Sequence, residues 1–480
     1  YNLFNKNQIF LIIILLSCIG SRILTSIYYI EDIDSLRFAL SIYEYDIIKL
    51  QPHFPGYPIF SFIAKCLYFI LGNMGVTFSI IGGISVFNII YFLLRISKLS
   101  PLSTSGLFLI FIIFFNPLVW LMSNRYMPDL FGLSIFISAL YFFISDIKDR
   151  KFLYLGYFLT GLLAGIRLSY LPLLIIPFLM RLKSRENRKF LILSFSIGCL
   201  IWLIPLILIT GFENIWSVGY NHTIGHFMDY GGSAFTNNDW SIRITRFIQS
   251  VWADGLGGYW LERSWQTFIF SIFLLLIFIQ SLRVLLINKL IDKNFKIIIG
   301  CLLVYSIWIF FSQNIIYKSR HILPILILFF IIFPLALKPL SRKFYPYIKA
   351  GVVAFCLFLF SISITIIGQH KNPSAIAQLK NDLEQQKSIK TVISTPLINY
   401  YLKLNGIKKK FINIENSKEF ELFKYENNND EILLIGNFKL MFKDDYTIIV
   451  DSIFYHNPYV NRMWSQIETY KIIKQKRGDI

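Results

Sequence analysis

Three acidic residues, Glu31, Asp32 and Asp34, lie within four positions directly after the first long apolar segment. Carboxylates at a membrane boundary are energetically costly and tend to be functional. The residues after Asp34 have the pattern of an amphipathic helix, which would turn its first residues toward water. Free backbone N–H groups at a helix start stabilise carboxylates there. Asp34 and Asp32 are therefore candidates for a general base, and either one could instead serve only as the helix cap.

A proline-rich segment, QPHFPGYP at 51–58, leads the chain back toward the next apolar stretch. Three prolines and a glycine specify a sharp and rigid turn. His53 and Tyr57 are the candidates for substrate binding in this loop. The alternative is a rigid loop in which His53 only forms a hydrogen bond.

Several cationic residues fall at the expected outer ends of apolar segments. Arginine binds phosphate through two parallel charge-assisted hydrogen bonds, and a departing phosphate needs such neutralisation as negative charge develops. Each cation could instead be an interfacial side chain that reaches toward lipid headgroups. Asp129 is a candidate salt-bridge partner of Arg125 or a second acid. The candidate cationic set is Arg125, Arg167, Lys318 and Arg320, together with His321.

The segment 220–232 contains two histidines, His222 and His226, four residues apart. On a helix they would share a face, and with a third ligand they could bind a divalent metal. The glutamate of a HExxH motif is absent, so the metal prediction is weak and no metal ligand is assigned. Aromatic residues and glycines mixed with Asp and His are also typical of a sugar-binding lid, in which His226 would be a substrate-binding candidate. The alternative is that the aromatic residues only anchor the segment at the membrane interface.

The composition points to a polytopic membrane protein. Hydrophobic residues make up 55% of the 480 residues, and the mean hydropathy is +0.57. Apolar runs of about seventeen residues or more are long enough to cross a bilayer as helices. With three shorter pieces, at 57–71, 151–167 and 169–181, we expect eleven or twelve membrane segments. The long runs lie at 8–30, 76–97, 104–123, 129–146, 189–210, 265–287, 297–314, 321–338 and 348–368.

The formal charge of +19 does not indicate nucleic acid, because the basic residues gather in short loops between apolar segments. That distribution is typical of cytoplasmic loops in membrane proteins. It predicts a multi-pass protein of the plasma membrane, with the active site and the tail outside the cytoplasm. These loops contain Arg95 and Lys98; Lys148, Arg150 and Lys151; Arg181, Lys183, Arg185, Arg188 and Lys189; Arg283, Lys289, Lys293 and Lys296; Lys338, Arg342, Lys343 and Lys349.

This orientation places the loops 31–56 and 211–264 outside, provided that the short segment 57–71 is tilted or re-entrant rather than spanning. The pieces 151–167 and 169–181 are predicted to form a helical hairpin with Arg167 at its tip. Segment 8–30 is predicted to be an anchor rather than a cleavable signal. The five cysteines all lie in apolar segments, without the spacing of a metal site.

From residue 371 onward apolar and polar residues alternate, which predicts strands. The runs lie at 390–394, 411–414, 431–435 and 446–451, and helix-like stretches lie at 373–387, 396–405 and 458–475. We therefore expect two domains: a helical membrane domain at 1–370 and a small extracytoplasmic α/β domain at 371–480. The tail has no glycine-rich nucleotide-binding motif.

Taken together, these motifs resemble the GT-C superfamily of integral-membrane glycosyltransferases, in particular protein O-mannosyltransferases, aminoarabinose transferases and bacterial proteins with a PHPPGYP-type loop. The resemblance covers roughly residues 20–370, and the order and placement of the short motifs carry it. They are DSLRFA at 34–39, PHFPGYP at 52–58, RYMPD at 125–129, RLSYLP at 167–172, His226 with Gly231 and Gly232, and RHILP at 320–324.

The resemblance implies a sugar donor on a polyprenyl phosphate, an acceptor hydroxyl on a lipid, glycan or protein, and a one-step inverting displacement. It implies that Asp34 is the general base, although Ser35 stands where many relatives have a second acid, so Asp32 remains an alternative. The donor phosphate would be bound by Arg320, Lys318, Arg167 and His321.

Two other functions share part of this pattern. A transporter or flippase of lipid-linked sugars would place ionisable residues near the membrane midplane, in broken helices of two corresponding halves. A polymerase or ligase of surface polysaccharide would use the same donor chemistry.

Overall fold

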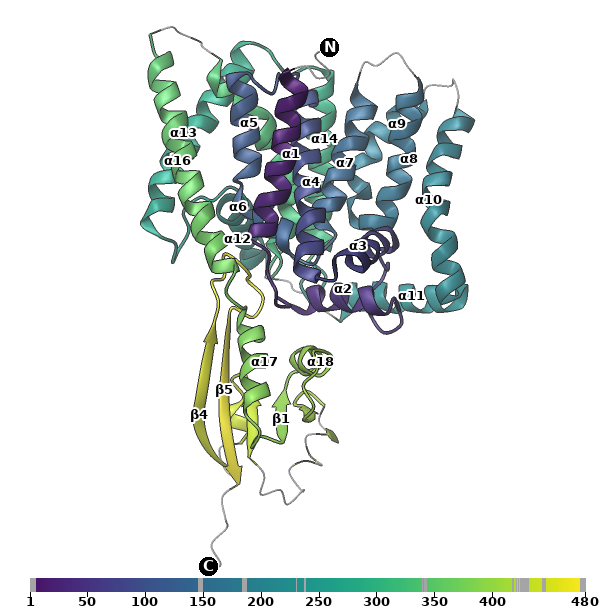
Figure 1. The fold of residues 1–480 in the computed structure, drawn as a ribbon, viewed down its shortest axis with the longest axis vertical. Helices are drawn as coiled ribbons and strands as arrows, with labels where there is room; N and C mark the ends of the chain where they lie inside the picture. Colours follow the sequence, from purple (N-terminus) through teal and green to yellow (C-terminus); the bar gives the residue numbers. More distant parts are fainter. Residues whose placement is uncertain are drawn as a thin grey trace, which may run out of the picture. The chain divides into compact units, whose positions relative to one another are not determined.

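The computed structural model of the chain divides into two compact units (Figure 1). The helical unit comprises Tyr1–Tyr28 and Arg37–Gly368, and the tail unit comprises Tyr29–Leu36 and Gln369–Ile480. The start of the acidic loop thus groups with the tail. The residues that the structure describes are 6–145, 150–183, 188–229, 231–236, 239–338, 340, 343–416, 418–419, 421, 423, 431–442 and 446–474.

Long apolar helices dominate the first 370 residues. Their bounds are α1 (Lys6–Leu24), α2 (Ile33–Tyr43), α3 (Pro58–Leu71), α4 (Met74–Ile96), α5 (Thr104–Phe114), α6 (Pro117–Asn124), α7 (Asp129–Ile144), α8 (Arg150–Arg167), η1 (Leu168–Leu174), α9 (Ile175–Lys183), α10 (Arg188–Thr210), α11 (Phe212–Met228), α12 (Trp240–Gln249), η2 (Ser250–Gly255), α13 (Trp265–Ile287), α14 (Lys293–Ser312), η3 (Ser319–Ile325), α15 (Leu326–Ile332), η4 (Phe333–Leu337) and α16 (Tyr345–His370).

By length and composition, eight helical segments within the described ranges can cross a membrane, or nine if the bent pair α5–α6 is one span. Two shorter apolar helices, α3 and α7, accompany them. Each long apolar run predicted from the sequence corresponds to one of these helices or helix pairs. The fold is therefore that of a helical polytopic membrane protein, as predicted.

The bend of 52° between α5 and α6 has a local cause. Pro117 begins α6, and Asn116 caps it by accepting a hydrogen bond from the Val119 N–H at 2.9 Å. The break leaves carbonyls of α5 without helical partners, and such groups must be satisfied inside a membrane protein. The fully buried Arg22 of α1 donates to one of them, the Phe114 carbonyl, at 2.8 Å.

The predicted hairpin at 151–181 is confirmed. The Tyr157 hydroxyl of α8 donates a 2.7 Å hydrogen bond to the Phe178 carbonyl of α9, and the two rings lie 4.5 Å apart. A continuous helix would hold these residues roughly 30 Å apart, at about 1.5 Å per residue. The chain therefore reverses within η1, directly after Arg167.

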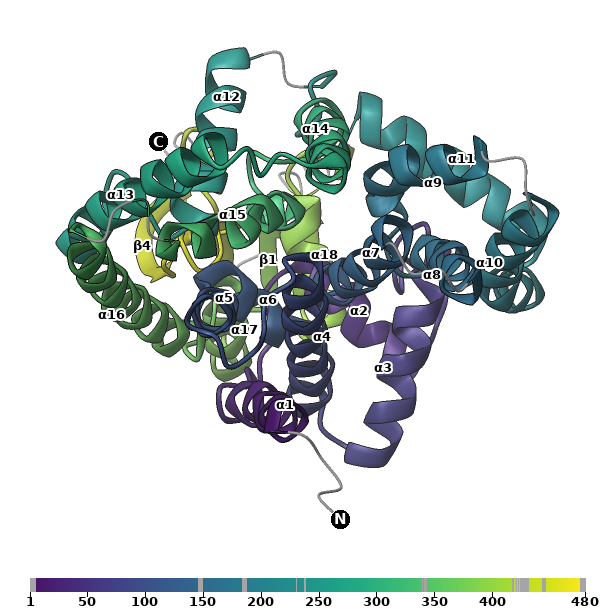
Figure 2. The same cartoon turned by 90° about the horizontal axis from the view of Figure 1, so that it is seen from above.

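The short helix α3 does not run with the bundle. It points toward the viewer in Figure 1 and is seen along its length in Figure 2, so it lies across the long helices. This direction agrees with the prediction that 57–71 is tilted or re-entrant. Because α4, α7, α9 and α13 run opposite to α1 (Figure 1), their last turns lie at the bundle end where α1 begins, and those of α4 and α9 carry Arg95, Arg181 and Lys183. The predicted loop residues Lys148, Arg185 and Arg342 lie outside the described residues.

The tail unit contains a five-stranded sheet in the order β2-β1-β3-β5-β4. Strand β1 pairs in parallel with β2 and β3, whereas β5 pairs antiparallel with β3 and β4. The elements are α17 (Ala375–Gln385), β1 (Thr391–Ser394), α18 (Pro396–Leu404), β2 (Lys410–Asn413), β3 (Ile432–Ile435), η5 (Lys439–Met441), β4 (Tyr446–Tyr455) and β5 (Gln466–Lys474).

The four predicted strands and the first two predicted helices of the tail are confirmed. The helix predicted at 458–475 is wrong, because the second half of that segment forms β5. Its alternate residues, including Tyr470 and Ile472, enter the buried core, and β5 fills the place between β3 and β4. Pairing on both sides outweighs local helix preference.

Candidate functional site

An ion cluster lies at the end of the helical bundle opposite the start of α1. Asp129 is the first residue of α7, and Arg167 is the last residue of the neighbouring antiparallel helix α8, so both reach the same end. The Arg167 Nη2 lies 2.8 Å from the Asp129 Oδ1, and the Arg320 Nε of η3 lies 3.6 Å from the same oxygen. The Asp129 side chain is only 1% exposed. Two guanidinium groups thus share one buried carboxylate.

The close approach of Arg167 to α7 depends on a glycine. A Cβ atom at Gly132, one turn after Asp129, would lie 2.7 Å from the Arg167 Cβ. A contact that short is not tolerated between side-chain carbons, so a larger residue would push Arg167 away from α7.

The re-entry loop joins the cluster through a tyrosine. Arg167 Nη1 donates to the Tyr57 hydroxyl at 3.3 Å, and this hydroxyl lies 3.1 Å from the His53 Nε2. Gly56 has a φ of +87°, which favours glycine, and its carbonyl accepts a 2.9 Å hydrogen bond from the Tyr45 hydroxyl. The loop therefore holds His53 and Tyr57 against the arginine.

Two histidines of α11 extend this line of contacts. The His53 ring is stacked on His222 at 5.7 Å, and His222 is stacked on His226 at 6.5 Å. The His226 Nε2 lies 2.5 Å from the Ser312 carbonyl at the end of α14. Across the described part of the chain, no three His, Cys, Asp or Glu side chains are grouped as a metal site requires.

Two buried tyrosines of the site were not predicted from the sequence. The Arg167 guanidinium carbon lies 5.7 Å from the Tyr170 ring centroid, and the Tyr170 and Tyr305 rings are also 5.7 Å apart. The Tyr305 hydroxyl donates to the His321 carbonyl at 3.0 Å and so fixes the segment that carries Arg320. No signal in the sequence marks Tyr305, because it lies within an apolar span.

The remaining predicted cations have other surroundings. Arg125 ends α6, is buried, and directs Nη1 toward the Met122 sulfur at 3.7 Å. Lys318 precedes η3 as its cap residue, and His321 is buried within η3. Arg320, Lys318 and His321 therefore share one short helical turn, as their spacing predicts.

The acidic residues Glu31, Asp32 and Asp34 belong to the tail unit. The Asp32 Oδ1 accepts a 2.8 Å hydrogen bond from the Ser35 N–H, so Asp32 is the cap of α2. Asp34 is the second residue of that helix and is only 3% exposed. Of the two proposed roles, Asp32 therefore fills the capping one.

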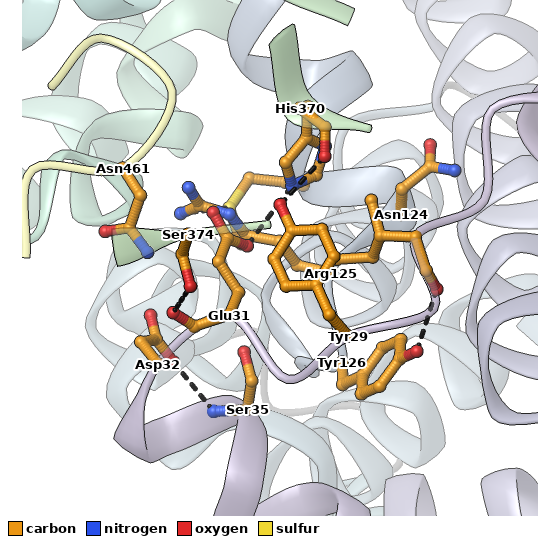
Figure 3. A network of polar contacts seen from close by, with 12 residues as sticks. Tyr29, Glu31, Asp32, Ser35, Asn124, Arg125, Tyr126, His370, Ser374 and Asn461 are labelled. Atoms are coloured by element: carbon orange, nitrogen blue, oxygen red, sulfur yellow. Dashed lines mark hydrogen bonds and ion pairs between the residues drawn. The ribbon is translucent and has the colours of Figure 1, made fainter. Parts of the chain in front are cut away.

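Contacts within the tail unit hold the acidic segment in place (Figure 3). The Glu31 carboxylate lies 3.2 Å from the His370 Nε2, and the Ser374 hydroxyl donates to the Glu31 carbonyl at 2.8 Å. Tyr401 of α18 donates to the Ile30 carbonyl at 2.6 Å. Burial raises the pKa of the Tyr401 hydroxyl, and the negative charges of Asp32 and Glu31 raise it further. The partner His370 was not predicted.

No protein-family model matches the chain, and no curated protein does. Solved structures do match. ArnT from Cupriavidus metallidurans bound to undecaprenyl phosphate superposes with a TM-score of 0.54 at 10% identity, covering 96% of this chain and 97% of that chain. The same protein in the apo state gives a TM-score of 0.58 at 10% identity, covering 97% and 98%. The chain is a multi-pass membrane protein with the fold of ArnT, a GT-C glycosyltransferase.

Proposed function

We propose that the protein is a glycosyltransferase that moves a sugar from a polyprenyl-phosphate donor to an acceptor hydroxyl. The observation that supports this most directly is the buried cluster of Arg167, Arg320 and Asp129 at one end of a membrane bundle with the fold of ArnT. The solved ArnT complex contains undecaprenyl phosphate, a lipid of the proposed donor class.

The charges of the cluster suit a phosphate ligand. Two guanidinium groups face the single Asp129 carboxylate, and together they carry more N–H donors than one carboxylate can accept. The N–H groups of arginine match the oxygens of a phosphate, and low exposure strengthens the attraction because water screens it less. Arg167 and Arg320, with Lys318 and His321 on the turn that carries Arg320, would stabilise the lipid phosphate as it leaves.

The reaction is a single displacement. An Asp34 oxygen takes the proton of the acceptor hydroxyl while the acceptor oxygen forms a bond to the anomeric carbon. The bond from that carbon to the phosphate oxygen breaks, and the polyprenyl phosphate leaves with the electron pair. Attack from the opposite side inverts the anomeric configuration. Asp34 suits this role better than Asp32, because Asp32 already accepts the capping hydrogen bond of α2.

The remaining site residues would bind and orient the substrates. Tyr57 and His53 adjoin Arg167, and His226 continues the same line of contacts. These three residues would therefore bind the sugar of the donor. Arg125 lies on the turn that leads to Asp129. The basic loops at the opposite bundle end support an extracytoplasmic site in the plasma membrane.

The test uses membrane-embedded enzyme and a panel of radiolabelled polyprenyl-phosphate sugars. The sugar that loses its label to an acceptor identifies the donor. Asp34→Asn should then reduce transfer by about 10²–10⁴-fold, the contribution of one well-placed base, with donor binding retained. Asp32→Asn is the matched control, because asparagine also caps helices. Full activity in Asp34→Asn would remove Asp34 as the base, and retention of label on every donor would refute the proposed function.

A further inference from the structure

A lysine-rich hollow lies within the tail unit, at the edge where α17 and α18 end and β1 and β2 begin. Its volume is about 870 Å³. Among the described residues that line it, Glu384 carries the only carboxylate, and its Oε1 already lies 2.7 Å from the Lys380 Nζ. The lysines that line it are Lys387, Lys390, Lys403, Lys408, Lys409 and Lys410.

The floor of the hollow is apolar. Leu383, Ile389 and Ile407 are buried beneath the lysines and belong to its lining. Pockets for small molecules usually measure about 300–1,000 Å³, so this hollow has room for a sugar-sized ligand rather than a bare ion alone. An apolar floor under cationic walls suits a ring that carries anionic groups.

Two of these lysines have a structural role. Lys409 Nζ donates to the Gln386 and Ile389 carbonyls, each at 2.7 Å, and so closes the wall of the hollow. Those carbonyls satisfy its hydrogen bonds without cancelling its charge. Lys403 lies in the last turn of α18, where a cation offsets the helix dipole. Neither role accounts for the exposed Lys408, which lies in the connection between α18 and β2.

We propose that this hollow binds a phosphorylated saccharide, either as a soluble glycan or as the headgroup of a lipid. Lysines act as point charges toward phosphate, and several around one concave surface concentrate the positive potential there. The inference concerns binding by the tail unit alone. That the ligand is the acceptor of the transfer reaction is an extension that rests on the proposed function.

The experiment measures binding to the full chain in neutral-lipid nanodiscs by calorimetry. The soluble probe is glucose 1,6-bisphosphate, with glucose as the uncharged control, and the lipid probe is monomeric dihexanoyl phosphatidylglycerol. The double variant Lys403→Gln/Lys408→Gln removes two charges from the hollow. The matched control, Lys371→Gln/Lys418→Gln, removes two charges from exposed lysines of the tail that do not line it.

We expect glucose 1,6-bisphosphate to bind and glucose not to bind. The hollow variant should bind about tenfold more weakly, and the control variant should bind as the unmodified protein does. Binding of only the lipid probe would overturn the saccharide assignment, because the headgroup of phosphatidylglycerol is glycerol phosphate and contains no sugar ring. Equal weakening in both variants, or no binding of either probe, would overturn the proposal. Because no sugar transfer is measured, its failure is distinct from failure of the proposed reaction.

Discussion

Replacing Asp129 with asparagine tests whether the ion cluster is built around this single carboxylate. Asparagine keeps the shape, but it replaces one acceptor oxygen with an NH2 donor and removes the charge that Arg167 faces at 2.8 Å and Arg320 at 3.6 Å. The side chains of Asp129 and Arg167 are 1% and 6% exposed, so water cannot replace the lost partner. Removing one partner of a buried pair costs about 3–5 kcal/mol, and we expect Asp129→Asn to fall within this range.

The assay is reversible unfolding in mixed micelles by titration with SDS, followed by circular dichroism. Asp129→Asn, Arg167→Gln and the double variant form a thermodynamic cycle. Because most of the loss in Asp129→Asn comes from an orphaned guanidinium, the double variant should be more stable than the sum of the single losses predicts. The expected coupling is about 2 kcal/mol.

A matched control removes the same charge from an exposed pair. Glu44 and Lys49 lie 2.5 Å apart, but their side chains are 59% and 54% exposed. Glu44→Gln should therefore cost about 1 kcal/mol at most. If Asp129→Asn costs no more than Glu44→Gln, or if the cycle gives additive losses, the reasoning about the buried cluster is wrong.

Two further substitutions test local geometry. Asp32→Ala should destabilise the protein by about 1 kcal/mol in the same SDS titration, because it removes the cap of α2. Asp32→Asn should be near neutral, because asparagine also caps helices. Equal losses of stability in the two variants would argue against capping. Gly132→Ala should lower stability and weaken the coupling between Asp129 and Arg167, although alanine in a helix normally stabilises by about 0.5–1 kcal/mol. The control is Gly351→Ala in α16, where an added Cβ meets no atom within 4 Å. A gain of stability in both glycine variants would contradict the crowding argument.

The sequence was sufficient for the membrane architecture. Hydropathy is a local property, since any segment that crosses lipid must be apolar along its length and satisfy its own backbone. Composition and spacing therefore predicted the positions of the long helices, the basic connections at one bundle end and the reversal after Arg167. The strands β1, β2 and β3 were also predicted from a local property, the alternation of apolar and polar residues, which does not require knowledge of their partners.

The partners in the candidate site were only partly predictable. The motifs that contain His53, Tyr57, Arg167 and Arg320 were singled out because polar residues at helix ends are conspicuous among apolar spans. Their contacts were not evident, since the sequence places Arg125 beside Asp129, whereas the structure pairs Asp129 with Arg167. Tyr305, in the middle of an apolar helix, carries no local mark that distinguishes it from a packing residue.

The sequence by itself determined which segments are apolar, which ends carry charge and which residues could do chemistry, because each of these depends on neighbours along the chain. The tertiary structure decided which charges meet and that α3 lies across the bundle. It also decided that residues 466–474 form a strand, β5, between β3 and β4. These outcomes depend on contacts between distant segments. Their energies arise only when burial removes water and brings those segments together.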